Sequence, residues 1–399
     1  MDWVVNMALV LCVQLLYCKA MFTLIRSLSK LITMLIVGFA VTPLAAQQYR
    51  QIEQGYPGIR LDQLHGGLGV PWGMTFLGPK RLLLAERSGK LRLLHLDTNR
   101  LLDLRGGAPR VVAEGQGGML DVDAGPNYAE DGWIYFTYSK RSKSEAVTTL
   151  ARARLQQSRL ADWQDLLVTD SATDTRRHYG SRIAFDDEGH VFFGIGDRGR
   201  RDLAQDLGNH VGAIIRLELD GSVPRDNPFV GDPQALDEIW SYGHRNPQGL
   251  LFDRETRRLW SIEHGPRGGD EINLILKGRN YGWPVVSHGK EYWGPLSIGE
   301  GTEKPGIEPP RKVYIPSIGP GSLMMYRGEA FPQWHGNLFA GALKLRHLNR
   351  ISLSKSGRAI GEERLLEDLG ERIRALLQGP EGLIYLSTDS GRILRLAPD

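Results

Sequence analysis

One supersecondary pattern recurs six times along the chain and constrains its fold more than any other feature. Each copy has an apolar strand, a turn that contains Gly, Asp or Pro, and a second strand of aromatic and β-branched residues. One such unit cannot bury both of its faces alone, so the units must stack on one another. The sequence therefore predicts an all-β, six-bladed β-propeller of four-stranded antiparallel blades, rather than a two-sheet β-sandwich. The copies cover residues 73–94, 120–137, 182–194, 249–262, 322–340 and 375–387.

The first 46 residues differ in composition from the rest of the chain. Arg26 and Lys30 precede an apolar run over residues 31–41, and the small residues Ala45 and Ala46 follow, which is the layout of a secretion signal peptide. The apolar runs are shorter than the roughly 20 residues that a membrane-spanning helix needs. We predict a signal peptide over residues 1–46, cleaved near Ala46, in which residues 1–20 fit an upstream extension of the start site. An uncleaved signal anchor is the alternative.

Residues 47–399 are predicted to form one periplasmic domain that does not span the membrane. Both cysteines, Cys12 and Cys18, lie in the leader, so this domain has neither a disulfide nor a thiolate metal site. The formal net charge of the full chain is +3. The leader carries three basic residues and one acidic residue, so the domain alone has a charge of +1. This near-neutral charge gives no electrostatic reason to expect nucleic-acid binding.

Two segments around the third repeat carry polar residues that a strand does not require. Residues 178–182 read His-Tyr-Gly-Ser-Arg and lead into the repeat, while residues 194–199 read Gly-Ile-Gly-Asp-Arg-Gly and close its aromatic strand. The unperturbed pKa of histidine is near neutrality, so His178 in a cleft could accept a proton from a substrate hydroxyl. Taken alone, His178 fits a turn or a hydrogen-bonding role equally well.

Three denser polar motifs surround the fourth repeat. Residues 242–249 read Tyr-Gly-His-Arg-Asn-Pro-Gln-Gly, residues 263–273 read Glu-His-Gly-Pro-Arg-Gly-Gly-Asp-Glu-Ile-Asn, and residues 280–284 read Asn-Tyr-Gly-Trp-Pro. Arginine offers a planar fork of donors to carboxylates, and a Gly-Pro turn can direct backbone carbonyls towards a hard cation. Together the motifs could hold an acidic ligand bridged by a metal ion, whereas each motif alone fits an ordinary turn.

In this order and spacing, the motifs resemble the soluble glucose/sorbosone dehydrogenase family, most closely its bacterial aldose sugar dehydrogenase branch, from about Gly66 to the C-terminus. The resemblance implies a catalytic domain that uses pyrroloquinoline quinone (PQQ) and calcium to oxidise an aldose sugar at its anomeric carbon to a lactone. It implies His178 as the general base while hydride passes to PQQ, with an unidentified electron acceptor downstream. Arg177 departs from the acidic residue of the glucose-oxidising branch, whose long insertions are also absent. Glucose is therefore not assigned as the preferred sugar, and an open pocket and a monomer are expected.

The resemblance also implies a set of cofactor and metal ligands. The arginines and the lysine of the set would face the three carboxylates of PQQ. Alternatively, Arg372 and Arg374 lie on the solvent-exposed face of a strand, because residues two apart project to the same side. The carbonyls of Gly265 and Pro266 match ligands of a calcium ion that contacts PQQ. Glu271 and the carbonyl of Tyr281 match a second, structural calcium ion. The residues matched to PQQ contacts are Gln116, Arg245, Asn246, Tyr292, Ala342, Leu343, Lys344, Arg372, Ile373 and Arg374.

Two other functional classes remain open for a propeller of this kind. A metal-dependent propeller lactonase also places a divalent ion on the axis, and a non-catalytic propeller binds a protein or glycan on one face. Neither class needs several Arg and Lys residues that converge on an acidic cofactor. This convergence favours the dehydrogenase.

Overall fold

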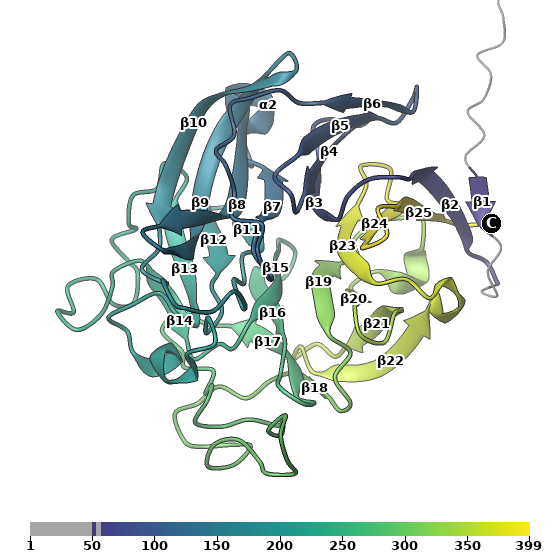
Figure 1. Cartoon of the computed structure of the whole chain (residues 1–399). Helices are drawn as coiled ribbons and strands as arrows, with labels where there is room; N and C mark the ends of the chain where they lie inside the picture. The colour runs from purple at the N-terminus through teal and green to yellow at the C-terminus, as the bar shows by residue number, and fades with distance from the viewer. Residues whose placement is uncertain (1–49, 53–56) are drawn as a thin grey trace, which may run out of the picture. The chain divides into compact units, whose positions relative to one another are not determined.

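The computed structural model of this chain describes residues 50–52 and 57–399, which belong to one unit, Tyr49–Asp399. Six antiparallel sheets surround a common axis in this unit (Figure 1). Five sheets have four strands and one has five. The prediction of a six-bladed β-propeller is confirmed. The predicted signal peptide, residues 1–46, lies outside the described residues.

Each blade has four strands that follow one another outward from the axis. The inner strands are β3 (Pro71–Phe76), β7 (Met119–Ala124), β11 (Ile183–Phe185), β15 (Pro247–Asp253), β19 (Pro320–Met325) and β23 (Ile373–Gln378). The second strands are β4 (Arg81–Glu86), β8 (Trp133–Ser142), β12 (His190–Gly194), β16 (Arg258–Glu263), β20 (Leu338–Ala342) and β24 (Ile384–Thr388). The third strands are β5 (Leu91–His95), β9 (Glu145–Gln156), β13 (Ala213–Glu218), β17 (Asp270–Ile275), β21 (Leu348–Leu353) and β25 (Ile393–Ala397). The outer strands are β6 (Arg100–Asp103), β10 (Arg159–Val168), β14 (Ile239–Tyr242), β18 (Lys312–Tyr314), β22 (Ala359–Leu365) and β2 (Arg60–His65).

The sixth blade joins the two ends of the described chain. Its outer strand, β2, comes from the N-terminal side and pairs antiparallel with β25, with Leu61 opposite Leu396. A short strand, β1 (Arg50–Ile52), extends this sheet by pairing with β2. The ring of blades is therefore closed by backbone hydrogen bonds between segments at opposite ends of the sequence.

The hydrophobic core lies between the blades. Six clusters of buried apolar side chains each join two neighbouring sheets, so that every sheet shares one cluster with the sheet on either side. Between the third and fourth blades, for example, Phe192 and Ile214 pack with Leu250 and Leu259. Burial of both faces explains why β12 is a continuous run of buried residues and does not alternate.

One side chain, Arg182, links the inner strands around the axis. It directly precedes β11, and its guanidinium donates to the Asp121 carboxylate on β7 and to backbone carbonyls of β3, β15, β19 and β23. Each of these carbonyls belongs to a residue where the register between the inner and second strands shifts, as at a β-bulge. Arg182 therefore connects all six blades. The four carbonyls are those of Trp72, Gln248, Gly321 and Arg374.

The helices of the described residues are short and lie between strands. They are α2 (Tyr128–Asp131) and the 3-10 turns η1 (Arg201–Gln205), η2 (Pro332–Trp334) and η3 (Glu367–Leu369). Across residues 50–52 and 57–399, none of the helices has the length and apolar character needed to cross a membrane.

Candidate active site

The predicted polar motifs gather at one end of the axis. His178 precedes β11, Asn246 directly precedes β15 and Arg372 directly precedes β23. Because Arg182 contacts the first residues of the inner strands, these strands all begin at the same end of the axis. Loops that are far apart in the sequence therefore meet there.

The His178 imidazole is paired with a carboxylate that the sequence analysis did not assign. His178 Nδ1 lies 2.6 Å from Asp197 Oδ1, and the His178 side chain is only 12% exposed. Trp283 Nε1 donates to the other oxygen, Asp197 Oδ2, at 2.8 Å. Because an ionised carboxylate can only accept, Nδ1 donates and Nε2 of the neutral ring is left as the acceptor. The pair therefore holds His178 in the tautomer that a general base needs.

The environment of His178 favours its neutral form. Burial lowers its pKa below the ordinary value of 6.5, and the nearby charges of Arg245 and Arg177 act in the same direction, while Asp197 opposes them. Burial raises the pKa of Asp197, but the hydrogen bond from His178 and the charge of Arg245 outweigh it and hold this pKa below 3.8. At neutral pH the pair is a neutral imidazole beside a carboxylate.

The backbone at His178 is strained and closely packed. His178 has φ = 56°, in the left-handed region that few non-glycine residues adopt. Gln116 Oε1 accepts its N–H at 2.7 Å. A Cβ at Gly196 would lie 2.4 Å from the His178 carbonyl oxygen, so only glycine permits these two segments to approach. Such strain persists where the surrounding structure imposes it, as at many active sites.

Five of the residues matched to PQQ contacts line one axial cavity of about 120 Å³. The amide oxygen of Asn246 accepts from Gly180 N–H and Gln248 Nε2, and no described residue bonds to its Nδ2. The floor of this cavity includes Trp72, Gln248 and Arg374, whose carbonyls bind Arg182. The five residues are Gln116, Asn246, Leu343, Arg372 and Arg374.

Two arginines of this cavity share one acid. Arg372 Nε and Arg374 Nε lie 2.7 and 2.8 Å from the two oxygens of Asp389. Arg374 is 5% exposed and its guanidinium stacks on the Trp72 ring at 3.9 Å, so the alternative of a solvated face is wrong for this residue. One carboxylate against two guanidinium groups leaves an excess of positive charge on this wall.

The four residues matched to calcium line a second, smaller cavity of about 20 Å³. Its size is that of a single water molecule or ion. Asp270 fixes the turn by accepting the Gly265 N–H at 2.9 Å. A Cβ at Gly265 would lie 2.2 Å from the Gly269 oxygen, so this turn requires glycine. The four residues are Gly265, Pro266, Glu271 and Tyr281.

Two acids, Glu263 and Glu271, line the small cavity together. Burial and the neighbouring Glu263 raise the pKa of Glu271 to about 8. The Tyr281 carbonyl accepts no hydrogen bond from a described residue. Carboxylate and carbonyl oxygens around a space of this size are the donor set that calcium prefers, and a bound cation would offset the repulsion between the acids. The residues present therefore fit a calcium ion.

Arg245 also lines the small cavity. Its Nη1 donates to the carbonyls of His264 and Gly265 at 2.9 and 2.8 Å. Its Nη2 reaches the Tyr292 hydroxyl at 3.4 Å, and that hydroxyl donates to the Pro266 carbonyl at 3.1 Å. The guanidinium thus bonds to carbonyls on the side of this cavity where the first calcium ion was predicted.

The remaining predicted residues line neither cavity. Ala342 and Ile373 are fully buried within strands. Lys344 is exposed, and its ammonium pairs with no described residue. Tyr292 is 66% exposed and reaches the site through its hydroxyl. His178 also lines neither cavity, although its neighbours Tyr179 and Gly180 line the larger of the two. The structure therefore brings together most of the predicted set but places these five residues at its edge.

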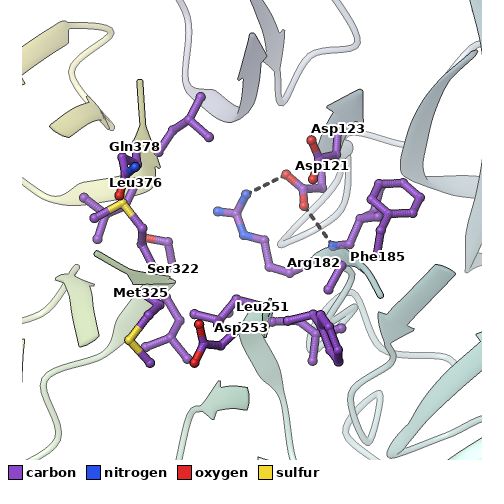
Figure 2. A pocket seen from close by; sticks show the side chains of 18 of the residues that line it. Asp121, Asp123, Arg182, Phe185, Leu251, Asp253, Ser322, Met325, Leu376 and Gln378 are labelled. Carbon is purple, nitrogen blue, oxygen red and sulfur yellow. Dashed lines mark hydrogen bonds and ion pairs between the residues drawn. The ribbon is translucent and has the colours of Figure 1, made fainter. Parts of the chain in front are cut away.

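A cavity larger than these two lies elsewhere in the described residues. It measures about 760 Å³ and is lined by the later residues of the inner strands. Figure 2 shows residues that line it, among them Asp121, Arg182 and Asp253. Because His178 precedes an inner strand, this cavity lies at the other end of the axis from His178. Arg182 and Asp121 lie on its wall, so they separate it from the cavity beside Asn246. None of the predicted site residues lines it.

A carboxylate and histidine cluster on the third blade is engaged by arginines. Asp186, Glu188 and His190 bring ligand atoms close enough to share a metal ion. Arg257 is ion-paired with Glu188, and Arg216 Nη2 lies 3.0 Å from His190 Nε2. These guanidinium groups supply the positive charge of the cluster, so we assign no metal site there.

Sequence reasoning missed the residues that support the site. Asp197 and Trp283 orient His178, while Glu263 accepts the N–H groups of Arg245 and Asn246 at 2.6 and 3.3 Å. All three lie in motifs that the sequence analysis singled out. Their partners come from other blades or from the neighbouring strand, so only the fold reveals the pairing.

Comparisons with known proteins agree with this geometry. The sequence profile of the Glucose / Sorbosone dehydrogenase family matches residues 68–395. The aldose sugar dehydrogenase YliI of Escherichia coli is 37% identical over 85% of this chain and 93% of its own length. The apo-form crystal structure of the soluble aldose sugar dehydrogenase of E. coli has a TM-score of 0.82 at 36% identity, and covers 86% of this chain and 100% of its own. The PQQ-bound aldose sugar dehydrogenase of Streptomyces coelicolor has a TM-score of 0.71 at 26% identity, with 86% and 100% covered.

The fold and the site define a propeller oxidoreductase of the sugar dehydrogenase class. The chain belongs to the glucose/sorbosone dehydrogenase family, as the motifs of residues 242–284 predicted.

Proposed function

We propose that this protein is a PQQ- and calcium-dependent aldose sugar dehydrogenase that oxidises the anomeric carbon of its substrate to a lactone. The observation that carries the proposal is the His178–Asp197 pair, which lies at the same end of the axis as the cationic cavity. A base held in one tautomer beside a positively charged wall suits the oxidation of an alcohol by an acidic cofactor.

His178 takes the proton of the anomeric hydroxyl in this proposal. Asp197 holds Nδ1, so the unprotonated Nε2 is the atom that accepts. Its lowered pKa keeps the ring neutral at pH 7, and Asp197 stabilises the imidazolium that forms after proton transfer. Asn246 and Gln116 have amide N–H groups with no bond to a described residue, and these can orient polar groups of the ligands.

The cationic wall would hold the cofactor. Arg372 and Arg374 outnumber Asp389, and the Lys344 ammonium has no described partner, so the wall can accept carboxylates. Bound there, PQQ supplies a quinone that accepts two electrons. The PQQ-bound relative from S. coelicolor supports this choice of cofactor.

The carbonyls of Gly265 and Pro266 and the carboxylate of Glu271 would hold calcium. The donor set supports both ions, whereas the volume of the small cavity supports one of them. We place a first ion at Gly265 and Pro266, beside the cofactor, and a second at Glu271 and Tyr281. The chain's own contribution is to fix hard oxygen ligands in a space from which bulk water is excluded.

Family membership favours this function over the two alternatives. A propeller lactonase or a binding propeller would share the fold, but neither needs paired arginines and an oriented histidine at the same end of the axis. Arg177 is exposed next to His178, where the glucose-oxidising branch has an acidic residue, so we propose an aldose as the substrate without assigning glucose as the preferred one.

We also propose that residues 1–46 direct export to the periplasm and are removed there, and that the mature protein is a monomer which passes electrons to a separate acceptor. N-terminal sequencing of the exported protein and its mass in solution test these points.

A direct assay tests the catalytic proposal. The mature chain, loaded with PQQ and calcium, should reduce an artificial electron acceptor in the presence of aldoses and release the lactone. The His178→Gln variant, assayed in parallel, should bind PQQ but turn over slowly. Absence of dye reduction with every aldose, or hydrolysis of lactones without PQQ, would overturn the proposal.

A further inference from the structure

The side chain of Arg245 is buried but incompletely satisfied. It is 6% exposed, and its two Nη groups contact the carbonyls of His264 and Gly265 and the Tyr292 hydroxyl. Its Nε is also buried and has no hydrogen-bond partner among the described residues. A buried charged donor without an acceptor lowers the stability of the fold, and the contacts of the two Nη groups leave the Nε–H of Arg245 unsatisfied. Such a group is poised to exchange one set of partners for another.

Only the side chain of Arg245 is free to make this exchange. Glu263 Oε2 accepts the N–H groups of Arg245 and Asn246, and the Arg245 carbonyl accepts the Asp197 N–H at 2.8 Å. The backbone is therefore fixed on both sides. The Arg245 guanidinium carbon lies 5.3 Å from the centre of the Trp283 ring, which leaves an aromatic surface beside it.

Arg245 and a divalent cation would compete for the same oxygen. Gly265 is one of the two residues whose carbonyls we propose as ligands of the calcium ion beside the cofactor, and its oxygen already accepts from Arg245 Nη1 at 2.8 Å. A calcium ion bound at that carbonyl oxygen would lie within a few ångströms of the guanidinium. Two cations at one carbonyl, in a site with little water, repel each other strongly.

We propose that Arg245 is an exchangeable cation: a divalent ion displaces its guanidinium from the Gly265 carbonyl, and the displaced guanidinium turns to a carboxylate of the acidic cofactor. This inference rests on the proposed function. Metal and cofactor then assist each other's binding, because each favours the same position of one side chain. By linkage, the factor by which the metal tightens cofactor binding equals the factor by which the cofactor tightens metal binding.

Calcium titration of the full-length, PQQ-free protein by calorimetry tests the exchange without any enzymatic assay. Arg245→Met removes the competing cation while retaining the apolar part of the side chain, so this variant should bind calcium at least about 10-fold tighter than the parent. Adding PQQ should tighten calcium binding in the parent by a similar factor and have a smaller effect in the variant. If Arg245→Met does not fold, Arg245→Gln provides the same comparison.

The matched control is Arg201→Met. Arg201 lies 5.6 Å from the centre of the same Trp283 ring, but it pairs with Glu291 and donates to none of the carbonyls of residues 264–266. Its removal should change calcium affinity by less than about 3-fold. Equal tightening in both variants would mean that only net charge matters and would overturn the exchange.

The outcomes separate this inference from the proposed function. If Arg245→Met binds calcium no more tightly than the parent, while the parent oxidises aldoses with PQQ and calcium, the exchange is wrong and the function stands. If the parent binds no calcium, both the exchange and the calcium part of the proposed function are wrong.

Discussion

Arg182 Nη1 and Asp121 Oδ1 lie 2.9 Å apart on the axis, where the two side chains are 9% and 11% exposed (Figure 2). Burial raises the pKa of Asp121, and Arg182 opposes this by stabilising the charged form. The same guanidinium donates hydrogen bonds to four backbone carbonyls, each at a register shift in the inner strand of another blade. Each of these groups would otherwise be a buried polar atom without a partner.

We therefore expect Arg182→Met to be among the most destabilising substitutions in the propeller. It leaves the buried Asp121 carboxylate without its counter-ion and four carbonyls without their Arg182 donor, and loss of one partner of a buried ion pair costs about 3–5 kcal/mol. Urea unfolding of the variant should show this loss. The double variant Arg182→Met/Asp121→Asn should recover part of it, because the unpaired charge is gone. A single variant as stable as the parent would show that the axis does not depend on this pair.

Substitutions at the histidine pair should separate binding from turnover. His178→Gln should slow aldose oxidation by roughly 100- to 10,000-fold with little change in PQQ affinity, since the cofactor wall is built by other residues. Asp197→Asn should also slow the reaction, because an amide can donate to Nδ1 and so favour the wrong tautomer. Stopped-flow reduction at saturating PQQ and a cofactor titration measure the two effects. Parent-like turnover in His178→Gln would mean that another residue is the base.

The pH dependence of the reaction follows from the same pair. Because the pKa of His178 is lowered chiefly by burial, the neutral base should persist to below pH 6.5. The kcat/KM of the enzyme should therefore be flat from about pH 6.5 upward and fall only on the acid side. Asp197 raises the His178 pKa, so Asp197→Asn should move the acid limb to lower pH. If kcat/KM began to fall already above pH 6.5, or if the fall moved to higher pH in Asp197→Asn, His178 would not be the titrating base.

The sequence predicted the blades more completely than the site, for a physical reason. Strand alternation and turn residues are local, so all six pairs of inner and second strands were found. The outer strand β2 of the last blade pairs with β25 across almost the whole chain, and no local pattern indicates that pairing. The same limit applies to Asp197. Its role depends on contacts with His178 and Trp283, which lie in other segments of the sequence.

The 760 Å³ cavity contains a carboxyl group, Asp123, that should couple stability to pH. Burial, together with the nearby Asp121, raises the pKa of Asp123 to about 7, although Thr75 donates to it at 2.9 Å. The unfolded chain loses this proton near pH 4, so the group destabilises the fold progressively as pH rises from about 4 to 7. Asp123→Asn removes the charge and can still accept from Thr75. It should raise stability by about 1–3 kcal/mol at pH 8 and have little effect at pH 4. Equal thermal shifts at both values would contradict the raised pKa.

Removal of metal tests the buried acids of the small cavity. Glu263 and Glu271 line it together, and burial beside Glu263 raises the pKa of Glu271 to about 8, so without a cation Glu271 is mostly protonated at neutral pH. A calcium ion that binds the ionised carboxylate in the folded state should raise the melting temperature. An ion present at 100 times its Kd stabilises the folded state by about 2.7 kcal/mol. Chelation should therefore lower the melting temperature, and calcium should restore it.

Glu271→Gln should lose most of this calcium-dependent shift, because an amide is a weaker ligand and leaves less charge for the ion to offset. Glu329→Gln changes an exposed acid that lines none of the three cavities described above, so this control should retain the full shift. If Glu271→Gln kept the parent's calcium response, its carboxylate would not be a ligand, and the ion would have to be held by the Gly265 and Pro266 carbonyls alone.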